Sequence, residues 1–137
     1  MKSFEGHTHH VLGVSWRSDG RLLASAGADG VIKTWSLDTG EQVRTIGGFG
    51  KQVTGVRFIR FSSQTVSSSG DRTARLHNTD DGGNPRNFGG ATDYLYAVAT
   101  TPDGKVVAAG GHSSVLHVWD GTNGQPLGTF APPEAGK

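Results

Sequence analysis

Three residues in the first quarter of the chain, His7, Ser25 and Asp29, have the composition of a hydrolytic triad. In such a triad the histidine takes the proton of the serine hydroxyl, and the aspartate holds the imidazole in place. Nucleophilic catalysis also needs an exposed serine, an oxyanion hole and a cleft beside it. No motif in the sequence signals these features. We therefore expect no catalytic residue and a chain that is not an enzyme.

Histidines near the N-terminus raise the separate prospect of a metal site, because closely spaced imidazoles are common metal ligands. His7, His9 and His10 lie close together in sequence. A structural role explains His7 better, and His9 with His10 is interpreted as an incidental solvated pair. His77 and His117 fall in β-rich segments, where His77 is expected to pack and not to bind. We predict no metal site.

Phosphate-binding loops and thiol chemistry are also absent from the sequence. Paired glycines at 47–48, 82–83, 89–90 and 110–111 are followed neither by a Gly-Lys-Ser/Thr ending nor by a helical pattern. With no cysteine, the chain cannot form a disulfide, a thiolate zinc site or a covalent c-type haem link. No cofactor is expected.

Charge and hydropathy argue against nucleic acid and membranes as partners. The 137 residues carry a formal net charge of +1, which gives no general attraction to a polyanion or an anionic membrane. The opening MKSFEGHTHH lacks the apolar stretch of a secretory signal, and no run of apolar residues is long enough for a transmembrane helix. We expect a soluble chain, and the sequence indicates no particular compartment.

The elements that must position these residues are set by an internal repeat of 42 residues, which needs no insertion anywhere. The aligned sets are Trp35, His77 and Trp119; Gly6, Gly48 and Gly90; Val14, Val56 and Val98; and Gly40, Gly82 and Gly124. We therefore predict one domain, 1–137, with repeats at approximately 6–47, 48–89 and 90–131, and a Pro-rich tail at 132–137.

Each repeat is predicted to form four antiparallel strands, called a, b, c and d in chain order. In the first repeat the β-rich runs VLGVSW, RLLASAGA, VIKTWS and EQVRTI alternate with turn residues. Asp-Gly pairs at 19–20, 29–30 and 103–104 supply the positive φ angles that tight hairpins need. The pattern is typical of consecutive four-stranded meanders.

This repeat resembles the WD-repeat β-propeller family, which has a period of about 40 to 45 residues, a Gly-His start and a Trp-Asp end. Gly6-His7 begins the first repeat, and Trp119-Asp120 ends strand c of the third. The departures from the pattern are Phe49, His77 and Asn78 in the second repeat, and Ala91 and Ser113 in the third. The resemblance implies an all-β fold of three four-stranded antiparallel propeller blades, which is a partial propeller.

The resemblance also implies a structural role for His7, Ser25, Asp29 and Trp35. Equivalent residues of WD repeats form a buried hydrogen-bond chain, in which the aspartate accepts from the imidazole and the serine links the imidazole to the indole N–H. Such a chain leaves its polar groups satisfied and holds the turns of one blade together. We interpret these four residues as a structural tetrad.

WD-repeat propellers generally bind a peptide or protein, and the loop rim on the tetrad side is where the resemblance places that contact. The candidates are His9, His10, Lys51, Gln52, Asp93 and Tyr94 in loops from strand d to strand a, and Ala28, Arg72 and His112 in loops from b to c. Tyr94 and Arg72 are the first choices, because tyrosine and arginine are enriched among interface hot spots. The alternative for each is an ordinary exposed loop residue.

Positive charge is concentrated in the middle repeat. Residues 48–89 carry six lysines and arginines against three aspartates, a balance of +3, whereas residues 90–131 have a balance of −2. Ordinary solvated faces are the preferred interpretation. The alternative is an arginine patch that binds an acidic peptide, a carboxylate or a phosphate.

Three blades are too few for a closed propeller, which needs roughly four to eight. The outer faces of the first and last blades would expose apolar side chains. We expect the ring to close by head-to-tail self-association, a six-bladed dimer being favoured over a nine-bladed trimer, or with blades absent from this sequence. The predicted function is a non-enzymatic scaffold; the alternatives are a structural fragment of a larger propeller, and an accessory domain of an enzyme or electron-transfer protein.

Overall fold

The computed structural model describes residues 3–131, and the regular secondary structure of these residues consists of β-strands. The predicted tail at 132–137 lies outside the described residues. The strands are β1 Val11–Trp16, β2 Leu22–Gly27, β3 Ile32–Ser36, β4 Gln42–Ile46, β5 Val53–Phe58, β6 Gln64–Ser69, β7 Ala74–Asn78, β8 Arg86–Phe88, β9 Leu95–Thr100, β10 Val106–Gly111, β11 Leu116–Asp120 and β12 Pro126–Phe130. Within the described range no helix is long and apolar enough to cross a membrane.

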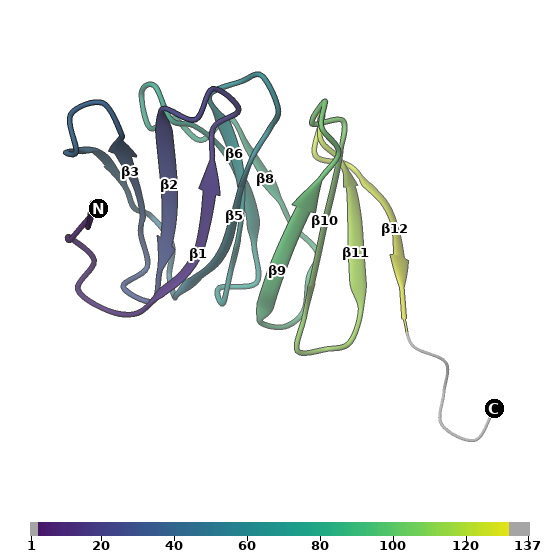
Figure 1. Ribbon diagram of the computed structural model, residues 1–137. Coiled ribbons are helices and arrows are strands. Elements are labelled where there is room, and N and C mark those ends of the chain that lie inside the picture. The colour runs from purple at the N-terminus through teal and green to yellow at the C-terminus, as the bar shows by residue number, and fades with distance from the viewer. Residues whose placement is uncertain (1–2, 132–137) are drawn as a thin grey trace.

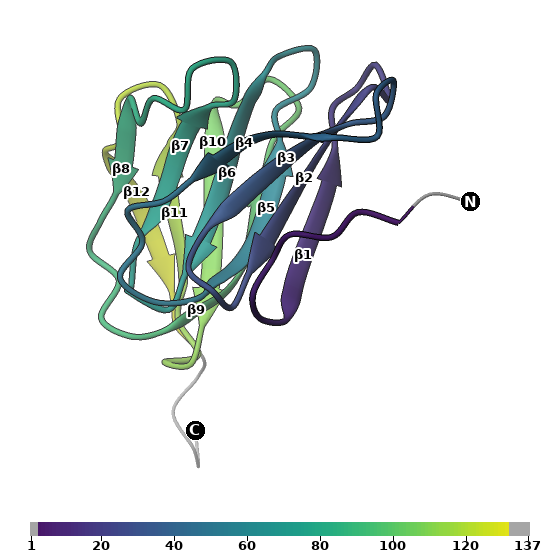
Figure 2. The ribbon, with the colours of Figure 1, turned by 90° about the vertical axis from the view of Figure 1, so that its left-hand side faces the viewer.

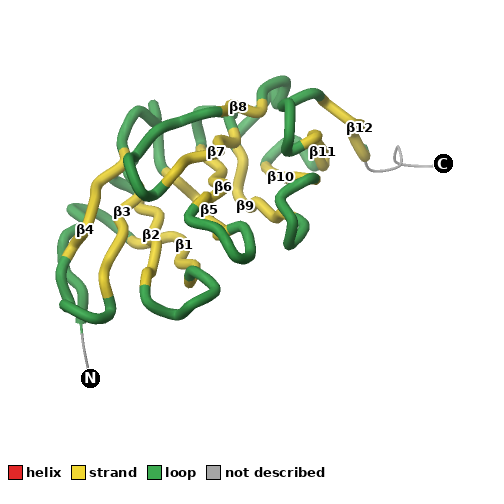
Figure 3. Tube along the Cα trace, turned by 90° about the horizontal axis from the view of Figure 1, so that it is seen from above, coloured by secondary structure: helices red, strands yellow, loops and turns green. Residues whose placement is uncertain are grey.

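The twelve strands form three separate four-stranded antiparallel sheets, β1–β4, β5–β8 and β9–β12, so the predicted all-β fold with three blades is confirmed. Each sheet is a meander in which consecutive strands pair. The sheets stand side by side in an arc (Figure 1). Viewed from above, β1, β5 and β9 lie on the inner side of the arc, and β4, β8 and β12 lie on the outer side (Figure 3). The arc is open, as expected for a partial propeller.

The hydrophobic core lies between the sheets. Ile32 and Ile46 of the first sheet form one buried cluster with Val53 and Val56 of the second. A second cluster joins the second sheet to the third; its members include Phe88, Leu95, Val98 and Trp119. Because each blade is a single layer of strands, its apolar side chains lose contact with water only where another blade covers them.

The face of the first sheet that points away from the second sheet is uncovered. Val14 of β1 has a relative exposure of 58%, whereas its repeat equivalents Val56 and Val98 have exposures of 3% and 6%. Val11 is likewise exposed, although its counterpart Val53 is fully buried. Figure 2 looks toward this sheet from its outer side, and no other sheet of the described residues covers it. The first blade therefore presents a junction face without a neighbour.

The far face of the third sheet is uncovered in the same way. Phe130 has a relative exposure of 63%, whereas its equivalents Ile46 and Phe88 are buried at 4% and 0%. Leu116 is exposed, although its counterpart Ile32 is fully buried. The arc thus ends in two apolar faces, and each has the pattern of one half of an internal junction.

Arginines on the last strand of a blade bridge the outer edges of neighbouring sheets. Arg44 donates from Nε to the carbonyl oxygen of Thr79 at 3.2 Å and from Nη2 to that of Asp80 at 2.7 Å. Arg86, which is 42 residues later, donates from Nη1 to the carbonyl oxygen of Gly121 at 2.9 Å. Gly128 takes this position in the third repeat, so a junction formed by the third blade would lack the arginine bridge.

Candidate functional site

Two loops of each blade lie together at the lower edge of the molecule in Figure 1, namely the loop that leads into its first strand and the loop between its second and third strands. One backbone hydrogen bond joins the two loops in every repeat. The three bonds run from the amide of Ala28 to the carbonyl of His10 at 2.8 Å, from Gly70 to Gln52 at 2.9 Å, and from His112 to Tyr94 at 2.8 Å. The 42-residue period is therefore kept in the geometry of this rim.

The first blade brings His7, Ser25, Asp29 and Trp35 into one hydrogen-bonded chain. His7 Nδ1 lies 3.0 Å from Asp29 Oδ2, and His7 Nε2 lies 2.6 Å from Ser25 Oγ. The indole Nε1 of Trp35 donates to the same serine oxygen at 2.9 Å. With Nδ1 donating to the carboxylate, the Ser25 hydroxyl donates to Nε2 and accepts from the indole, so each polar group has a partner.

The carboxyl group of Asp29 is stabilised in its charged form. Burial works to raise its pKa, but hydrogen bonds from the Thr8 amide and from His7 outweigh this effect, so the pKa of Asp29 lies below its ordinary value. Ser25 is buried, and its hydroxyl is already committed both as donor and as acceptor. A serine in this position is not placed to attack a substrate.

The second blade has no such chain. Phe49 replaces the histidine and His77 replaces the tryptophan; their rings pack with centroids 5.5 Å apart. Ser67 Oγ and His77 Nδ1 are buried without a hydrogen-bond partner in the structure. Burial lowers the pKa of His77 to about 4, and the nearby charge of Arg75 contributes. His77 is therefore held neutral at physiological pH.

An ion pair stabilises the rim of the second blade instead. Arg75 Nη2 lies 2.9 Å from Asp71 Oδ2, and Arg75 Nη1 donates to the carbonyl oxygen of Gly48 at 2.9 Å. The guanidinium of Arg75 also stacks over the Phe49 ring, 4.6 Å from its centroid. Asp71 accepts a further bond from the Gly50 amide at 3.2 Å. These contacts tie the same two loops together by a different set of side chains.

The third blade uses its tryptophan differently again. Trp119 Nε1 donates to the carbonyl oxygen of Gly89 at 2.8 Å, because Ala109 stands where the first blade has Ser25. Ala91 and Ser113 stand where the first blade has histidine and aspartate. His117 stacks on the Trp119 ring at 5.7 Å. The complete four-residue chain is therefore confined to the first blade among the described residues.

Two adjoining pockets, here called the rim groove, run along the loops from the first blade to the third. One pocket is lined by Ala28, Asp29, Gly30, Phe49, Gly50, Lys51, Gln52 and Tyr94, and the other by Gly50, Lys51, Gly70, Asp71, Arg72, Thr92, Asp93 and Tyr94. The groove therefore brings together the rim candidates Ala28, Lys51, Gln52, Arg72, Asp93 and Tyr94.

Tyr94 is held rigidly at the centre of the rim groove. Its ring lies against Gly70, so closely that a Cβ atom at position 70 would overlap the ring. The Tyr94 hydroxyl donates to Gln52 Oε1 at 3.2 Å, and the Tyr94 amide donates to Asp93 Oδ1 at 2.7 Å. The tyrosine thus presents a fixed aromatic surface between the second and third blades.

The remaining rim candidates lie outside the groove. His9 and His10 are exposed, with their Nδ1 atoms 3.0 Å apart, and they line a separate shallow pocket. No group of three histidines, cysteines or carboxylates among residues 3–131 is arranged to hold a metal ion. His112 lies beside Tyr96, whose hydroxyl is 3.3 Å from His112 Nδ1.

Tyr96 was not among the sequence candidates, although its ring is exposed and lies 5.0 Å from that of Tyr94. In the pairing of β9 with β10, Leu95 and Ala97 have partners and Tyr96 falls at a register shift. A β-bulge breaks the alternation of side chains between the two faces of a strand, and this alternation in the sequence does not predict where a bulge occurs. The available signal in the sequence was a second tyrosine two positions after Tyr94.

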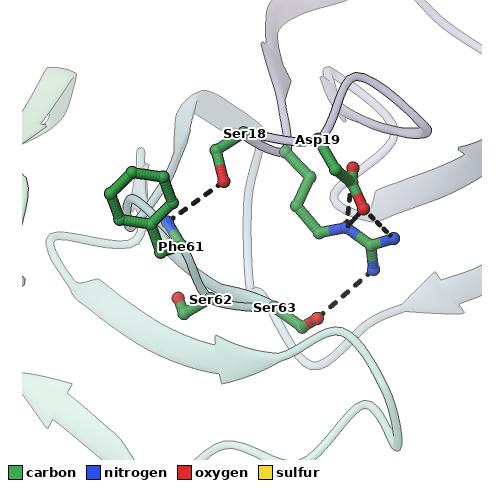
Figure 4. A pocket seen from close by; sticks show the side chains of 6 residues that line it. Ser18, Asp19, Phe61, Ser62 and Ser63 are labelled. Atoms are coloured by element: carbon green, nitrogen blue, oxygen red, sulfur yellow. Dashed lines mark hydrogen bonds and ion pairs between the residues drawn. The ribbon is translucent and has the colours of Figure 1, made fainter.

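A further pocket lies at the opposite edge, where the first turns of the first two blades meet (Figure 4). Arg17 Nη2 lies 2.7 Å from Asp19 Oδ2, and Arg17 Nη1 lies 3.3 Å from Ser63 Oγ, so the guanidinium is already paired within the chain. Ser18 Oγ accepts from the Phe61 amide at 3.1 Å. Phe61 is exposed and has a φ of +58°, a conformation that favours glycine. These bonds join the two turns to each other.

A family model described as WD domain, G-beta repeat, matches residues 1–36, 40–78 and 83–120. Among curated proteins, protein tipD of Dictyostelium discoideum is 29% identical over 119 residues, covering 87% of this chain and 19% of its own length. Nuclear distribution protein PAC1 of Arthroderma otae is 29% identical over 130 residues, covering 87% of this chain and 28% of its own. Small ribosomal subunit protein RACK1y of Oryza sativa subsp. japonica is 37% identical over 172 residues, covering 89% and 51%. The chain spans about half or less of the length of these relatives.

Replacement of Ser25 by alanine should lower the free energy of unfolding by about 1 to 3 kcal/mol, because the buried donors and acceptors of His7 and Trp35 lose their shared partner. Ser67→Ala is the matched control at the equivalent position, where the hydroxyl has no partner, and should be nearly neutral or stabilising. Urea denaturation of both variants checks the difference. Equal losses in the two variants would contradict the role of the hydrogen-bond chain.

Stability should decrease as the pH is lowered from 7 to 5, in part because of His77. The pKa of His77 is about 4 in the folded chain and about 6.5 in the unfolded chain, so the unfolded chain binds more protons in this window. The expected loss is about 2 kcal/mol, with stability fully present above the unfolded value. Denaturation at both pH values should show this loss in the His112→Leu control and a smaller one in His77→Leu. Parallel curves for the two variants would refute this assignment.

Proposed function

Because the chain belongs to the WD40 repeat family, we propose that it is a non-enzymatic scaffold that closes its propeller by head-to-tail association with a second copy and binds a peptide or protein at the rim groove. The observation that carries the assembly is that each bare end face repeats one half of an internal junction. The partner of each end face is then the other end face of a second copy, which is the geometry of a closed ring.

Complementarity between the end faces supports this assembly. Inside the chain, Ile32 and Ile46 pack against Val53 and Val56. The exposed equivalents of the first pair are Leu116 and Phe130, and those of the second pair are Val11 and Val14. Burial of a large aliphatic or aromatic side chain stabilises by about 1.5 to 3 kcal/mol, so two such junctions in a dimer favour association strongly.

A dimer is favoured over a trimer on geometric grounds. Six blades need about 60° between neighbours and nine need about 40°, compared with about 51° in the usual seven-bladed ring. Six blades therefore distort the packing slightly less, and two subunits lose less association entropy than three. Gly128 removes the arginine bridge from the new junctions, so these rely on apolar contact more than the internal junctions do.

The non-enzymatic role is supported by the burial and saturation of the Ser25 hydroxyl, which leaves His7, Ser25, Asp29 and Trp35 as a structural tetrad that fixes the loops of the first blade. Binding at the rim is supported by the groove itself, which crosses three blades and has the rigid Tyr94 ring at its centre. Aromatic side chains held in this way are frequent anchors of protein interfaces.

Light scattering after size exclusion, at micromolar concentration, tests the assembly. The expected mass is twice the 14.3 kDa of one chain. Val14→Asp or Phe130→Asp should each give a monomer, because a carboxylate on the apolar face costs desolvation without a partner. Val43→Asp is the matched control: Val43 and its equivalent Leu127 are both exposed, so position 43 faces no junction and the dimer should persist.

Mixing the two monomeric variants distinguishes a head-to-tail contact from a symmetric one. Val14→Asp keeps an intact face at Phe130, and Phe130→Asp keeps an intact face at Val14, so the mixture should form a heterodimer through one junction. A folded, unaltered chain that stays monomeric at micromolar concentration would refute self-association. The end faces would then be expected to pack against further blades of a longer chain.

A further inference from the structure

We propose that the rim groove is specific for an anionic side chain on its partner peptide, and that Arg72 is the residue that recognises it, with Lys51 as a second cation and Tyr94 as the adjacent apolar surface. This inference rests on the proposed binding of a peptide or protein at the rim.

Arg72 occupies a backbone conformation that disfavours arginine. Its φ is +72°, in the left-handed region, and the equivalent residue of the first blade is Gly30 at +82°. A glycine adopts this conformation without penalty, whereas a residue with a Cβ atom is strained there. Strained positions of this kind cluster at functional sites. Ser114, the equivalent residue of the third blade, has a φ of +64°, so the strained turn is shared and the arginine side chain is particular to the second blade.

No contact within the chain accounts for the arginine at this position. The Arg72 side chain is exposed and makes no hydrogen bond or ion pair with any residue between 3 and 131. Arg75, three residues later, is by contrast bound to Asp71, Gly48 and the Phe49 ring. The guanidinium of Arg72 is therefore left available at the wall of the groove, beside Asp93 and Tyr94.

The carboxylates of the groove already accept hydrogen bonds from within the chain. Asp29 accepts from His7 and from the Thr8 amide, and Asp71 is paired with Arg75. Asp93 accepts the amide of Tyr94. The Lys51 side chain, like that of Arg72, has no hydrogen-bond or ion-pair partner within the described part of the chain. Lys51 and Arg72 are therefore the cations of the groove whose side-chain hydrogen-bond donors are not yet used, and an anionic group on the partner would satisfy them.

The chemistry of these groups defines the ligand. A guanidinium presents a planar fork of donors that fits a carboxylate or a phosphoryl group in a bidentate manner. The Tyr94 ring, which is fixed against Gly70, offers an apolar face to a neighbouring side chain of the same peptide. The expected ligand is a peptide with a glutamate, an aspartate or a phosphorylated serine close to an apolar residue.

The test uses oriented peptide libraries in which the central residue is glutamate, phosphoserine, serine or lysine and the flanking residues are degenerate. Fluorescence anisotropy with the full chain should give at least tenfold tighter binding for the glutamate or the phosphoserine library than for the serine and lysine libraries. The difference between the first two libraries identifies the source of the anion. Arg72→Ala should remove at least tenfold of this preference, and Arg72→Lys should retain part of it.

Arg72→Gly separates strain from recognition. It should raise the melting temperature by about 3 °C at fixed protein concentration, while the preference for acidic peptides is lost. Ser114→Gly is the matched control, because Ser114 is the equivalent residue of the third blade, has a φ of +64° and lies outside the groove. It should raise the melting temperature comparably without any change in peptide binding.

Each contrary outcome has a distinct meaning. Binding that favours the serine or lysine library, or a preference for acidic peptides that survives Arg72→Ala, overturns this inference and leaves peptide binding at the rim in place. A melting temperature unchanged or lowered in Arg72→Gly, while Ser114→Gly is stabilised, overturns the argument from strain. Absence of binding to all four libraries overturns both this inference and rim binding, whereas the ring assembly stands or falls by its own mass measurement.

Discussion

Burial of both faces of a single-layered sheet is the constraint on which the rest of this molecule depends. A four-stranded blade has apolar side chains on two sides and no second layer of its own, so its stability comes from the neighbouring blades. The two buried clusters lie at the two internal junctions, and the exposed valines and phenylalanine lie at the two ends. The same side-chain positions are core or surface according to whether a neighbour is present. Contact between blades and stability are in this sense one property.

The fold was predictable because its determinants are local and repeated. The alternation of apolar residues and the Asp-Gly turns recur at a fixed interval, and each predicts a strand or a hairpin without knowledge of distant residues. The turn at Phe61 is different, because its left-handed residue is an aromatic that no turn rule selects. The family resemblance predicted the contact between His7 and Ser25. It did not predict that the polar atoms of Ser67 and His77 are buried without a hydrogen-bond partner, because this depends on three-dimensional packing.

Charge was the least predictable feature of the rim. Composition counts Arg72, Arg75 and Arg86 alike, and together they make the middle repeat positive. In space Arg86 bridges two blades and Arg75 neutralises Asp71, so neither contributes free charge to the groove. Arg72, only three residues before Arg75, is unpaired. The direction of each side chain decides whether an arginine binds within the chain or faces solvent. A sum of charges over the sequence does not contain that information.

The hydrogen bonds that join the two rim loops in each blade run from backbone to backbone, at Ala28, Gly70 and His112. No side chain takes part in these three bonds, so the bonds themselves require only that the donor is not proline. Three blades that have kept different side chains at the rim nevertheless hold their loops in the same relative position. Selection can therefore alter the recognition chemistry of this surface one residue at a time while the framework beneath it is inherited unchanged.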